Sequence, residues 1–508
     1  MSEEAVVPGS VVDTLDPVAD LLAGALPYRG HPIALPDEQP LPSCTVHRRV
    51  THPSLAVTLT ARRGSEEVSR HHLEIAQLPL ERAAAPPRRR IHPAATTVLT
   101  LAPAAGAAQT PGAGAVAASG AAGAVREGGL ELTRTPEGGV TVHLPDVGPT
   151  PGQMERIAAM AREHRFVAVP APLGGDPVLT AALLLRVSAA AVACAVAPAL
   201  ARSLTLLHPA LREALAADPQ RLRDDDLAVA RAAADQRRAA WTHHDLRLSF
   251  APGDEGVWQP CLVPPRRPWI AVLLATRRPG LLAPALAQLA AQRDVDVEVA
   301  VLLHGAGDAD VGSRALAAAG LEGSVEVVDG RVPFGAVLNR GLERTSAPLV
   351  SKWDDDDLYG PRHLLDLVLA QRHSGAALVG KAPEFVYLQA SDTTVWRTPG
   401  RAEAPSVGLA GGTFLSPRPV LDGVGAFPPV GRAVDHHLKT RVVATGGEVF
   451  RTHGFGFVLR RHAAGHTWEA EDDRFLRRAV RTFEGLPAIL DLGDAVRFAR
   501  PAALEPRP

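Results

Sequence analysis

The sequence predicts a mixed α/β protein whose C-terminal half is built on a doubly wound, mainly parallel sheet. Two observations predict this fold. From residue 269 onward, short apolar runs of strand length alternate with helical stretches, an order typical of parallel strands with helices packed on both faces. Polar clusters follow several of the apolar runs, and open parallel sheets bind their ligands at the carboxyl ends of the strands.

The length and composition set the broad class of protein. A chain of 508 residues is too long for one ordinary domain, since domains average roughly 150 residues. Hydrophobic residues make up 46% and charged residues 21% of the chain, which is typical of globular proteins and excludes a disordered chain. The net charge of −2 gives no reason to expect nucleic acid or an anionic membrane as a partner.

The cysteines and the apolar segments indicate a cytoplasmic protein, with at most peripheral contact at the inner face of a membrane. Cys44, Cys194 and Cys261 are far apart and form no CxxC motif, so neither a zinc ribbon nor a disulfide framework is expected. The acidic N-terminus "MSEEAVVPGS" lacks the features of a signal peptide. The most apolar stretch, residues 178–201, is interrupted by Arg186 and is predicted to be a helix followed by a strand.

Shifts in composition divide the chain into five predicted segments. They are a β-rich N-terminal region (1–101), an Ala/Gly-rich linker (102–128), an α/β accessory domain (129–265), the doubly wound domain (266–470) and a C-terminal helix and tail (471–508). We find no chemical motif in the first 265 residues, so the N-terminal half is expected to be an α/β or α+β region of unassigned role.

The elements of the doubly wound domain follow one another in a regular order. Its predicted strands are 269–276, 295–305, 324–330 and 347–353, and its predicted helices are 280–292, 310–320, 334–346 and 362–370. The strands are apolar runs that suit a sheet buried on both faces. One compositional feature points to the end of the last strand: the only asparagine, Asn339, and the only three lysines, Lys352, Lys381 and Lys439, all fall between residues 339 and 439.

Four consecutive aspartates, Asp354 to Asp357, follow the strand 347–353. Negative charge at a helix N-terminus accounts for one or two of them, but four exceed what a cap needs. A calcium-binding EF-hand loop is excluded because Tyr359 and Leu365 stand where its glycine and glutamate belong. The stretch "GAALVGKA" (375–382) is no phosphate-binding loop, because it ends in alanine and is predicted to be a strand.

A carboxylate pair with i, i+2 spacing remains as the explanation. Asp354 and Asp356 would converge on a hard divalent cation, Mg²⁺ or Mn²⁺, together with a substrate diphosphate. The cation would offset the repulsion between the acids and stabilise the charge of a departing diphosphate.

The acidic motif lies within a longer pattern. The stretch "NRGLERTSAPLVSKWDDDDLYGP" (339–361) resembles the core of inverting family 2 glycosyltransferases of the GT-A fold, which combine an N-x-G helix, a short strand and a DxD-type motif. Residues 267–292 look like the first strand and nucleotide loop of that family, residues 409–427 like its acceptor-side segment, and residues 434–462 like the segment with its catalytic acid. The resemblance spans about residues 269–468.

The resemblance implies metal-dependent, inverting transfer from a nucleotide-diphospho-sugar, most simply a UDP-sugar, to a glycan, lipid-linked or protein acceptor. It places Asp354 near the ribose and the metal, Asp355 near the nucleotide, and Asp356 on the metal. If the register shifts by one residue, Asp355 and Asp357 have the roles of Asp354 and Asp356. Asp435 matches the general base, although Val434 stands where an acid usually precedes it. His436 is the alternative base, and Asp435 would also serve as a helix N-cap.

The remaining site residues follow from the same resemblance. Thr276, Arg277, Arg278 and Asp308 would lie near the nucleotide, and Lys381 would face the donor. Gly411, Gly412 and Thr413 would shape the acceptor side, where the glycines would permit a tight turn. His466, or else His462, would be a further metal ligand, and Trp468 would stack on a sugar or pack in the core.

Two other classes of function compete with this interpretation. A degenerate member of the fold would bind glycans or partners without transferring a sugar, but the intact acidic cluster argues against it. A sugar nucleotidyltransferase usually has a glycine-rich loop with basic residues after its first strand. The segment "ATRRPGLLAP" has the arginines but only one glycine, so this class is the less favoured of the two.

Overall fold

A computed structural model covers the 508 residues. It describes the strands within residues 3–144, parts of residues 157–172, and then residues 177–244, 267–397 except 306, 402–461 and 475–494. His462, His466 and Trp468 lie outside the described residues. The chain forms two compact units, residues 1–95 and residues 96–508.

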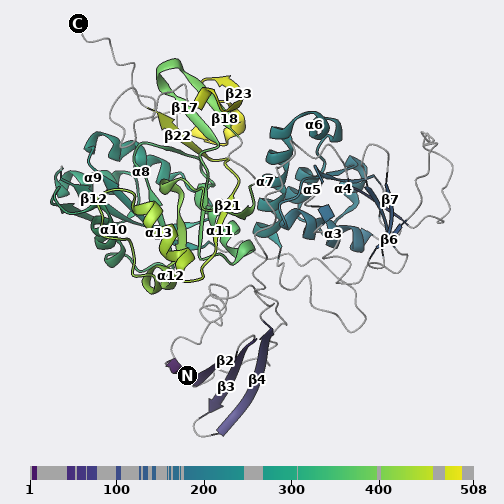
Figure 1. Ribbon diagram of the computed structural model, residues 1–508, viewed down its shortest axis with the longest axis horizontal. Helices are drawn as coiled ribbons and strands as arrows, with labels where there is room; N and C mark the ends of the chain where they lie inside the picture. The colour runs from purple at the N-terminus through teal and green to yellow at the C-terminus, as the bar shows by residue number, and fades with distance from the viewer. Residues whose placement is uncertain are drawn as a thin grey trace. The chain divides into compact units, whose positions relative to one another are not determined.

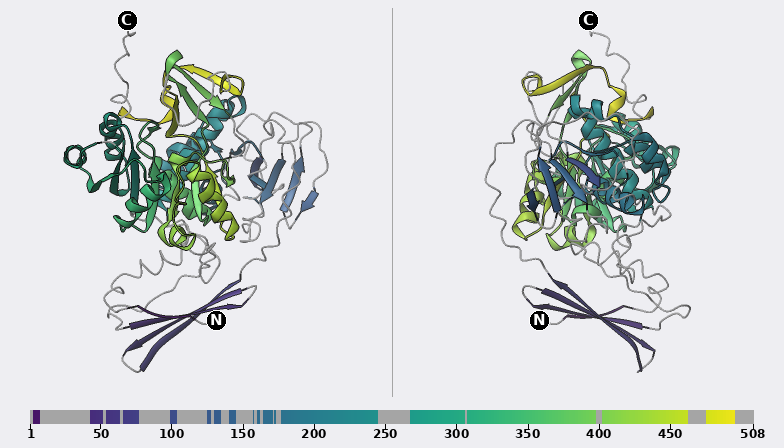
Figure 2. Two further views of the ribbon diagram at one scale, coloured as in Figure 1. Left: turned by 60° about the vertical axis from the view of Figure 1, so that its left-hand side comes forward. Right: turned by 90° about the vertical axis from the view of Figure 1, so that its right-hand side faces the viewer.

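The first unit is an antiparallel sheet of four strands in sequential order, with long neighbouring strands as Figure 2 shows. Its strands are β1 (Glu3–Val7), β2 (Ser43–Thr51), β3 (Ser54–Arg63) and β4 (Glu66–Ala76). The alternation of apolar and polar residues along β3 is the pattern of a half-buried strand.

The second unit begins with a six-stranded mixed sheet of order β10-β9-β5-β8-β7-β6. Its strands are β5 (Leu99–Pro103), β6 (Val125–Glu127), β7 (Leu130–Arg134), β8 (Val140–Leu144), β9 (Val167–Val169) and β10 (Cys194–Val196). The helices of this part are α3 (Pro177–Ala189), α4 (Pro198–Ser203), α5 (Pro209–Leu215), α6 (Pro219–Asp224) and α7 (Asp226–His243).

The apolar stretch at residues 178–201 folds as a helix and then a strand, α3 and β10. Both are buried in the core of this sheet and its helices. Within the described ranges, no helix is both long and apolar enough to cross a membrane.

The C-terminal part contains an eight-stranded sheet of order β13-β12-β11-β14-β20-β16-β21-β19. Strands β11, β12, β13 and β14 are mutually parallel, β20 is antiparallel to both of its neighbours, and β16 and β21 are again parallel. The bounds are β11 (Trp269–Thr276), β12 (Asp296–His304), β13 (Glu322–Val328), β14 (Leu349–Trp353), β16 (Leu378–Lys381), β19 (Ala404–Pro405), β20 (Leu415–Pro417) and β21 (Val449–Thr452). The predicted α/β fold with a mainly parallel sheet is confirmed.

Helices cover both faces of this sheet, and the alternation of side chains along β11 shows why. Ile270, Val272 and Leu274 pack in a core with α8 (Leu282–Ala290), α9 (Ala309–Ala318) and α11 (His363–Ser374). Ala271 and Leu273 face the opposite core, with α10 (Phe334–Glu343), α12 (Arg418–Gly423) and α13 (Val434–Ala444). Successive residues of a strand point to opposite faces, so a strand that is apolar throughout requires a helical layer on each side. Figure 1 labels these helices around the sheet.

A smaller five-stranded sheet follows the acidic motif, in the order β15-β22-β17-β18-β23. Its strands are β15 (Leu358–Tyr359), β17 (Phe385–Leu388), β18 (Thr393–Arg397), β22 (Phe457–Arg461) and β23 (Ala479–Glu484). Strand β23 lies in the segment for which the sequence suggests a helix, because its alternating residues pair with β18 in antiparallel register.

Candidate functional site

The four aspartates lie directly beyond the end of β14, beside the loop that follows β11. The two strands are parallel neighbours, with Leu274 opposite Trp353, so their carboxyl ends share one edge of the sheet. The hydroxyl of Thr276 donates to Asp355. Arg278 forms an ion pair with Asp355, and its Nη2 atom lies 2.8 Å from Oδ2 of Asp356. The structure therefore brings the predicted nucleotide loop and the acidic motif together.

The four carboxylates have different surroundings. Asp355 and Asp357 are buried. Asp355 contacts Thr276 and Arg278. The backbone N–H of Arg460 donates to Oδ1 of Asp357 at 3.0 Å. Asp354 and Asp356 remain partly open, with 33% and 20% of their side-chain surfaces exposed. The accessible pair is the one with i, i+2 spacing, Asp354 and Asp356.

Crowding and burial raise the pKa values of three of these acids. Burial raises the pKa of Asp354, Asp355 and Asp357, and neighbouring carboxylates add to the effect. Lys352 acts in the opposite direction on Asp354, because its Nζ atom donates to Oδ1 of that residue at 2.7 Å. Burial would lower the pKa of Lys352, but Asp354 and Asp435 outweigh burial and raise it. Lys352 is therefore a buried ammonium that serves as the counter-charge of the cluster.

Asp435 lies in the first turn of α13, on the other side of Lys352. Its Oδ1 atom is 3.6 Å from the Nζ atom of Lys352 and has no hydrogen-bond partner among the described residues. The N-cap of α13 is Ala433 rather than Asp435, so the alternative role of Asp435 as a cap is wrong. Ala433 has a positive φ of 55°, a conformation that costs a residue with a Cβ atom about 1 kcal/mol and is often kept at functional sites.

A turn at Gly411 and Gly412, part of the short 3₁₀ helix η6 (Gly411–Thr413), separates the two acids. A methyl carbon added to Gly411 would lie 1.8 Å from Oδ2 of Asp435, and one added to Gly412 would lie 2.7 Å from Oδ2 of Asp354. Each glycine leaves room for one carboxylate, because a side chain at either position would force that carboxylate to move. The turn thus sets the spacing of Asp354 and Asp435.

Tyr359 fastens this turn to the acidic motif. Its hydroxyl donates to the carbonyl of Gly412 at 3.0 Å and accepts the backbone N–H of Asp354 at 3.1 Å. Its ring stacks on Trp353 with a centroid distance of 3.8 Å. Tyr359 was not among the predicted site residues, and only its place two residues after the aspartates would have drawn attention to it.

All three lysines of the chain are hydrogen-bonded to residues 407–414, the segment that contains the turn. The backbone N–H of Lys352 donates to the carbonyl of Phe414, that of Lys381 donates to Oγ1 of Thr413, and Nζ of Lys439 donates to the carbonyl of Val407. The clustering of lysines between residues 339 and 439 is therefore a signal for this region, but no sequence pattern indicates that Lys352 lies between two carboxylates.

The other two residues that were expected near the nucleotide, Arg277 and Asp308, have their hydrogen bonds with groups other than the four acids. Arg277 turns toward His304 and donates from Nε to its Nδ1 atom at 3.2 Å and from Nη2 to the carbonyl of Gly330 at 3.0 Å. Burial, with the nearby charge of Arg277, lowers the pKa of His304. Asp308 is the N-cap of α9, where its carboxylate accepts the backbone N–H of Asp310 at 2.8 Å.

Lys381 does not face an open site. Its side chain is fully buried, its Nζ atom lies 3.1 Å from Oδ2 of Asp366, and it also donates to the carbonyl of Phe455. The ammonium of Lys381 is therefore neutralised inside the protein, and it is the backbone of Lys381 that is hydrogen-bonded to Thr413. We do not retain Lys381 among the residues that would touch a donor.

The carboxylates fit a divalent cation that the substrate completes. Among the described residues, no group of three or more His, Cys, Asp and Glu side chains could hold a metal ion by itself. Asp354 and Asp356 are hard oxygen donors with exposed surface, and Mg²⁺ is commonly bound by one or two carboxylates together with substrate phosphates. These two residues would therefore hold the ion only in the presence of a diphosphate, in competition with Arg278 for Asp356.

Comparison with known proteins finds no family model and no curated protein that matches this sequence. Among solved structures, the chain is similar to the mannosyltransferase PcManGT from Pyrobaculum calidifontis in complex with GDP-Man and Mn²⁺, at 17% identity and a TM-score of 0.31, over 40% of this chain and 59% of that one. It is also similar to S. aureus TarS 1–349 in complex with UDP-GlcNAc, at 13% identity and a TM-score of 0.32, over 41% of this chain and 64% of that one. The matches span about three fifths of those chains, and at these TM-scores they carry no argument about what this chain does.

Proposed function

We propose that the domain at residues 266–470 is an inverting glycosyltransferase that uses a nucleotide-diphospho-sugar and a divalent cation. One observation supports this most strongly. Asp354, at the end of β14, and Asp435, at the start of α13, lie on either side of one glycine turn and share the ammonium of Lys352, at 2.7 and 3.6 Å. A donor-binding acid and a base held this close suit a single displacement.

In the proposed reaction the acceptor hydroxyl attacks the anomeric carbon of the donor sugar. A new carbon–oxygen bond forms as the bond to the diphosphate oxygen breaks, and the nucleoside diphosphate leaves with the electron pair. The carboxylate of Asp435, in the first turn of α13, receives the proton of the hydroxyl. Attack on the face opposite the leaving group inverts the anomeric configuration.

The donor would bind along the edge formed by β11 and β14. Arg278, half exposed beside Asp355 and Asp356, is placed to pair with the diphosphate by its planar guanidinium. Asp354 and Asp356 would hold Mg²⁺ or Mn²⁺, which when bound supplies positive charge to a departing diphosphate. A glycan, lipid-linked or protein acceptor would approach from the side of Gly411 and Asp435.

A donor screen with the full-length protein tests this proposal. Nucleoside diphosphate release is measured from UDP-, GDP- and TDP-sugars with Mn²⁺, Mg²⁺ or EDTA, alone and with candidate acceptors. We expect release from one donor, dependent on metal and lost in Asp356→Asn. Asp329→Asn is the matched control, because Asp329 is a half-exposed aspartate that pairs with Arg331 at 2.7 Å.

If no donor is turned over, titration calorimetry with the nucleoside diphosphates distinguishes the possible reasons. Metal-dependent binding without turnover would favour a degenerate binding module. No turnover and no metal-dependent binding would contradict the proposal, and the aspartates would then be an acidic cluster neutralised only by Lys352 and Arg278. Release of pyrophosphate from a sugar phosphate and a nucleoside triphosphate would favour the nucleotidyltransferase.

A further inference from the structure

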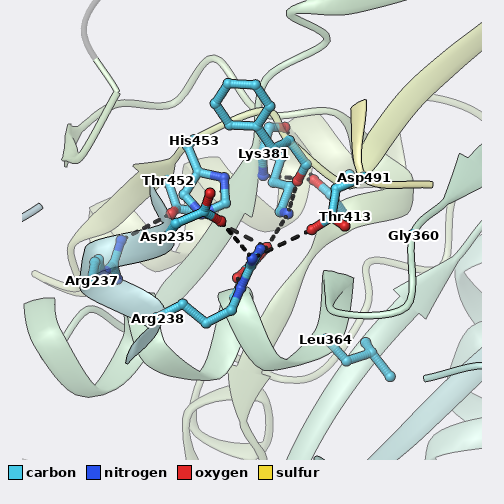
Figure 3. A network of polar contacts seen from close by, with 12 residues as sticks. Asp235, Arg237, Arg238, Gly360, Leu364, Lys381, Thr413, Thr452, His453 and Asp491 are labelled. Atoms are coloured by element: carbon cyan, nitrogen blue, oxygen red, sulfur yellow. Dashed lines mark hydrogen bonds and ion pairs between the residues drawn. The ribbon is translucent and has the colours of Figure 1, made fainter. Parts of the chain in front are cut away.

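A buried ion-pair network joins α7, from the part of the chain without a predicted motif, to the core of the candidate transferase domain (Figure 3). Arg238 of α7 forms a bidentate pair with Asp366 of α11, with Nε to Oδ1 at 3.0 Å and Nη2 to Oδ2 at 3.1 Å. The side chain of Asp366 is 1% exposed. A planar guanidinium on a buried carboxylate is a geometrically specific contact, not a solvated surface pair.

The network continues from Asp366 to the turn at the site. The Nζ atom of Lys381 lies 3.1 Å from Oδ2 of Asp366, so one carboxylate serves two cations. The backbone of Lys381 is hydrogen-bonded to the turn: its N–H donates to Oγ1 of Thr413 at 2.9 Å, and its carbonyl accepts the N–H of Ala410 at 2.8 Å. Arg238 is thus linked through two side chains to the segment that contains Gly411 and Gly412.

The charges of this network depend on one another. Arg238 and Lys381 outweigh burial and hold the pKa of Asp366 well below its usual range. Burial lowers the pKa of Lys381, and Asp366 opposes that effect. Arg238 also lies 3.1 Å from Asp235 and 3.4 Å from Asp491. Removal of one partner from such a group leaves a buried charge without compensation, which is costly and shifts the neighbours.

We propose that Arg238 is a positioning residue of the candidate site: through Asp366 and Lys381 it fixes the Gly411–Thr413 turn that spaces Asp354 and Asp435. Helix α7 is then a part of the transferase unit and not an independent accessory element. The placement of the turn stands on the contacts alone, and only its consequence for catalysis rests on the proposed function.

Hydrogen exchange of the full-length protein tests the placement without any substrate. The N–H groups of Lys381, Ala410 and Thr413, all hydrogen-bonded within this segment, report on the turn. In Arg238→Gln we expect them to exchange about tenfold faster, while the N–H groups of β12 do not change. Arg238→Lys retains the charge but not the bidentate geometry, so its turn should exchange at a rate between those of the unchanged protein and of Arg238→Gln. It replaces Arg238→Gln if that variant does not fold.

Arg231→Gln is the matched control, because Arg231 is on the same helix and shares two acids of the network with Arg238, Asp235 at 2.7 Å and Asp491 at 3.6 Å, but does not pair with Asp366. A local effect of Arg238 that Arg231 does not share supports the proposal. Faster exchange across the whole unit, an equal effect of both variants, or no effect in either would overturn it.

A second comparison tests whether Arg238 acts through the turn. Thr413→Ala removes the hydroxyl that accepts the N–H of Lys381, so Arg238→Gln added to it should speed exchange at that N–H by much less than Arg238→Gln alone. Additive effects at the N–H of Lys381 would contradict the route. If a donor is found, Arg238→Gln should lower kcat and leave the donor KM unchanged. A local exchange effect in a protein that shows neither turnover nor metal-dependent nucleotide binding would uphold the placement and refute the proposed function.

Discussion

At the residue scale, Gly411 and Gly412 contact different acids, so substitutions there should affect different steps. The added methyl of Gly411→Ala would meet Asp435, and that of Gly412→Ala would meet Tyr359 and Asp354. We expect Gly411→Ala to lower kcat by about a hundredfold, because a shift of about 1 Å in a reacting group costs that much, with donor binding retained. Gly412→Ala should instead weaken nucleotide binding. Steady-state kinetics and calorimetry measure the two effects.

The chain offers a control for these substitutions. Gly423, at the end of α12, has no atom within 4 Å of the position of an added methyl, so Gly423→Ala should leave both kcat and nucleotide binding unchanged. Equal losses in Gly411→Ala and Gly412→Ala would show that the turn does not separate the two acids.

Two glutamates at the residue scale should change stability with pH in opposite directions. Burial raises the pKa of Glu384 to about 7, although Arg451 opposes the shift. Its folded pKa lies above the unfolded value, so its contribution to stability is fully present below about pH 4.5 and is lost as the pH rises to about 7. We expect Glu384→Gln to raise the free energy of unfolding above pH 7 by about 3 kcal/mol and to have little effect at pH 4.5.

Glu326 provides the control with the opposite sign. Despite partial burial, Arg344 and Arg340 hold its pKa below the usual range, so its contribution is present above the unfolded pKa and is lost as the pH falls. Glu326→Gln should therefore lower the melting temperature at pH 7 and have little effect in acid. Thermal melts of both variants from about pH 2.5 to 9 measure the difference, and parallel curves would contradict it.

At the element scale, α10 holds the segment that leads to α13. The amide of Asn339 donates to the carbonyl of Phe427 and accepts its N–H, both at 2.9 Å, and the N–H of Gly335 donates to the carbonyl of Val430 at 3.0 Å. We expect Asn339→Ala to cost about 2 kcal/mol, because it leaves two backbone groups without partners, and to lower kcat by displacing Asp435.

The neighbouring residue on the exposed side of α10 serves for comparison. Arg340 pairs with Glu326 at 2.8 Å with 46% of its side chain exposed, so Arg340→Ala should cost less than about 1 kcal/mol. Denaturant unfolding measures the cost for each variant. An Asn339→Ala protein as stable and active as Arg340→Ala would show that the two hydrogen bonds between Asn339 and Phe427 contribute neither to stability nor to the position of Asp435.

The elements were the most predictable level of this structure. The strand and helix at residues 269–276 and 334–346 were expected within a few residues of β11 and α10, because burial on two faces leaves a periodic pattern in a short stretch of sequence. The placement of Lys352 between Asp354 and Asp435 was not predictable. It depends on how α13 approaches β14, and no local pattern records such a distance.

Contacts between distant segments also explain why the roles of Lys381 and α7 were not predicted correctly from the sequence. Lys381 was expected to face a donor because it ends a strand at the correct edge of the sheet. Its ammonium instead pairs with Asp366, which lies in a helix with the sequence pattern of an ordinary core helix. The sequence of α7 contains no motif, and its role depends on an arginine that meets a carboxylate 128 positions further along the chain. Contacts of this kind become visible only in the folded chain.

At the scale of the whole molecule, the second compact unit begins at residue 96 and includes α7. Leu227 and Ala234 of α7 share a core with Phe385, Trp396 and Phe455, in addition to the pair between Arg238 and Asp366. A fragment that begins at residue 267 would expose this apolar surface and leave Asp366 and Lys381 without Arg238. A fragment that begins at residue 96 would retain every one of these contacts.

We therefore expect residues 96–508 to unfold cooperatively at a melting temperature within about 2 °C of that of the full chain, since a change below 1 kcal/mol moves a unit of this size by no more than that. Residues 267–508 should show no cooperative transition, because burial of the affected side chains, not the position of the cut, decides whether a truncation is tolerated. Calorimetry of the two fragments and the full chain makes the measurement. A 267–508 fragment that melts like 96–508 would show that α7 is dispensable, and the assignment of Arg238 to the site would fail with it.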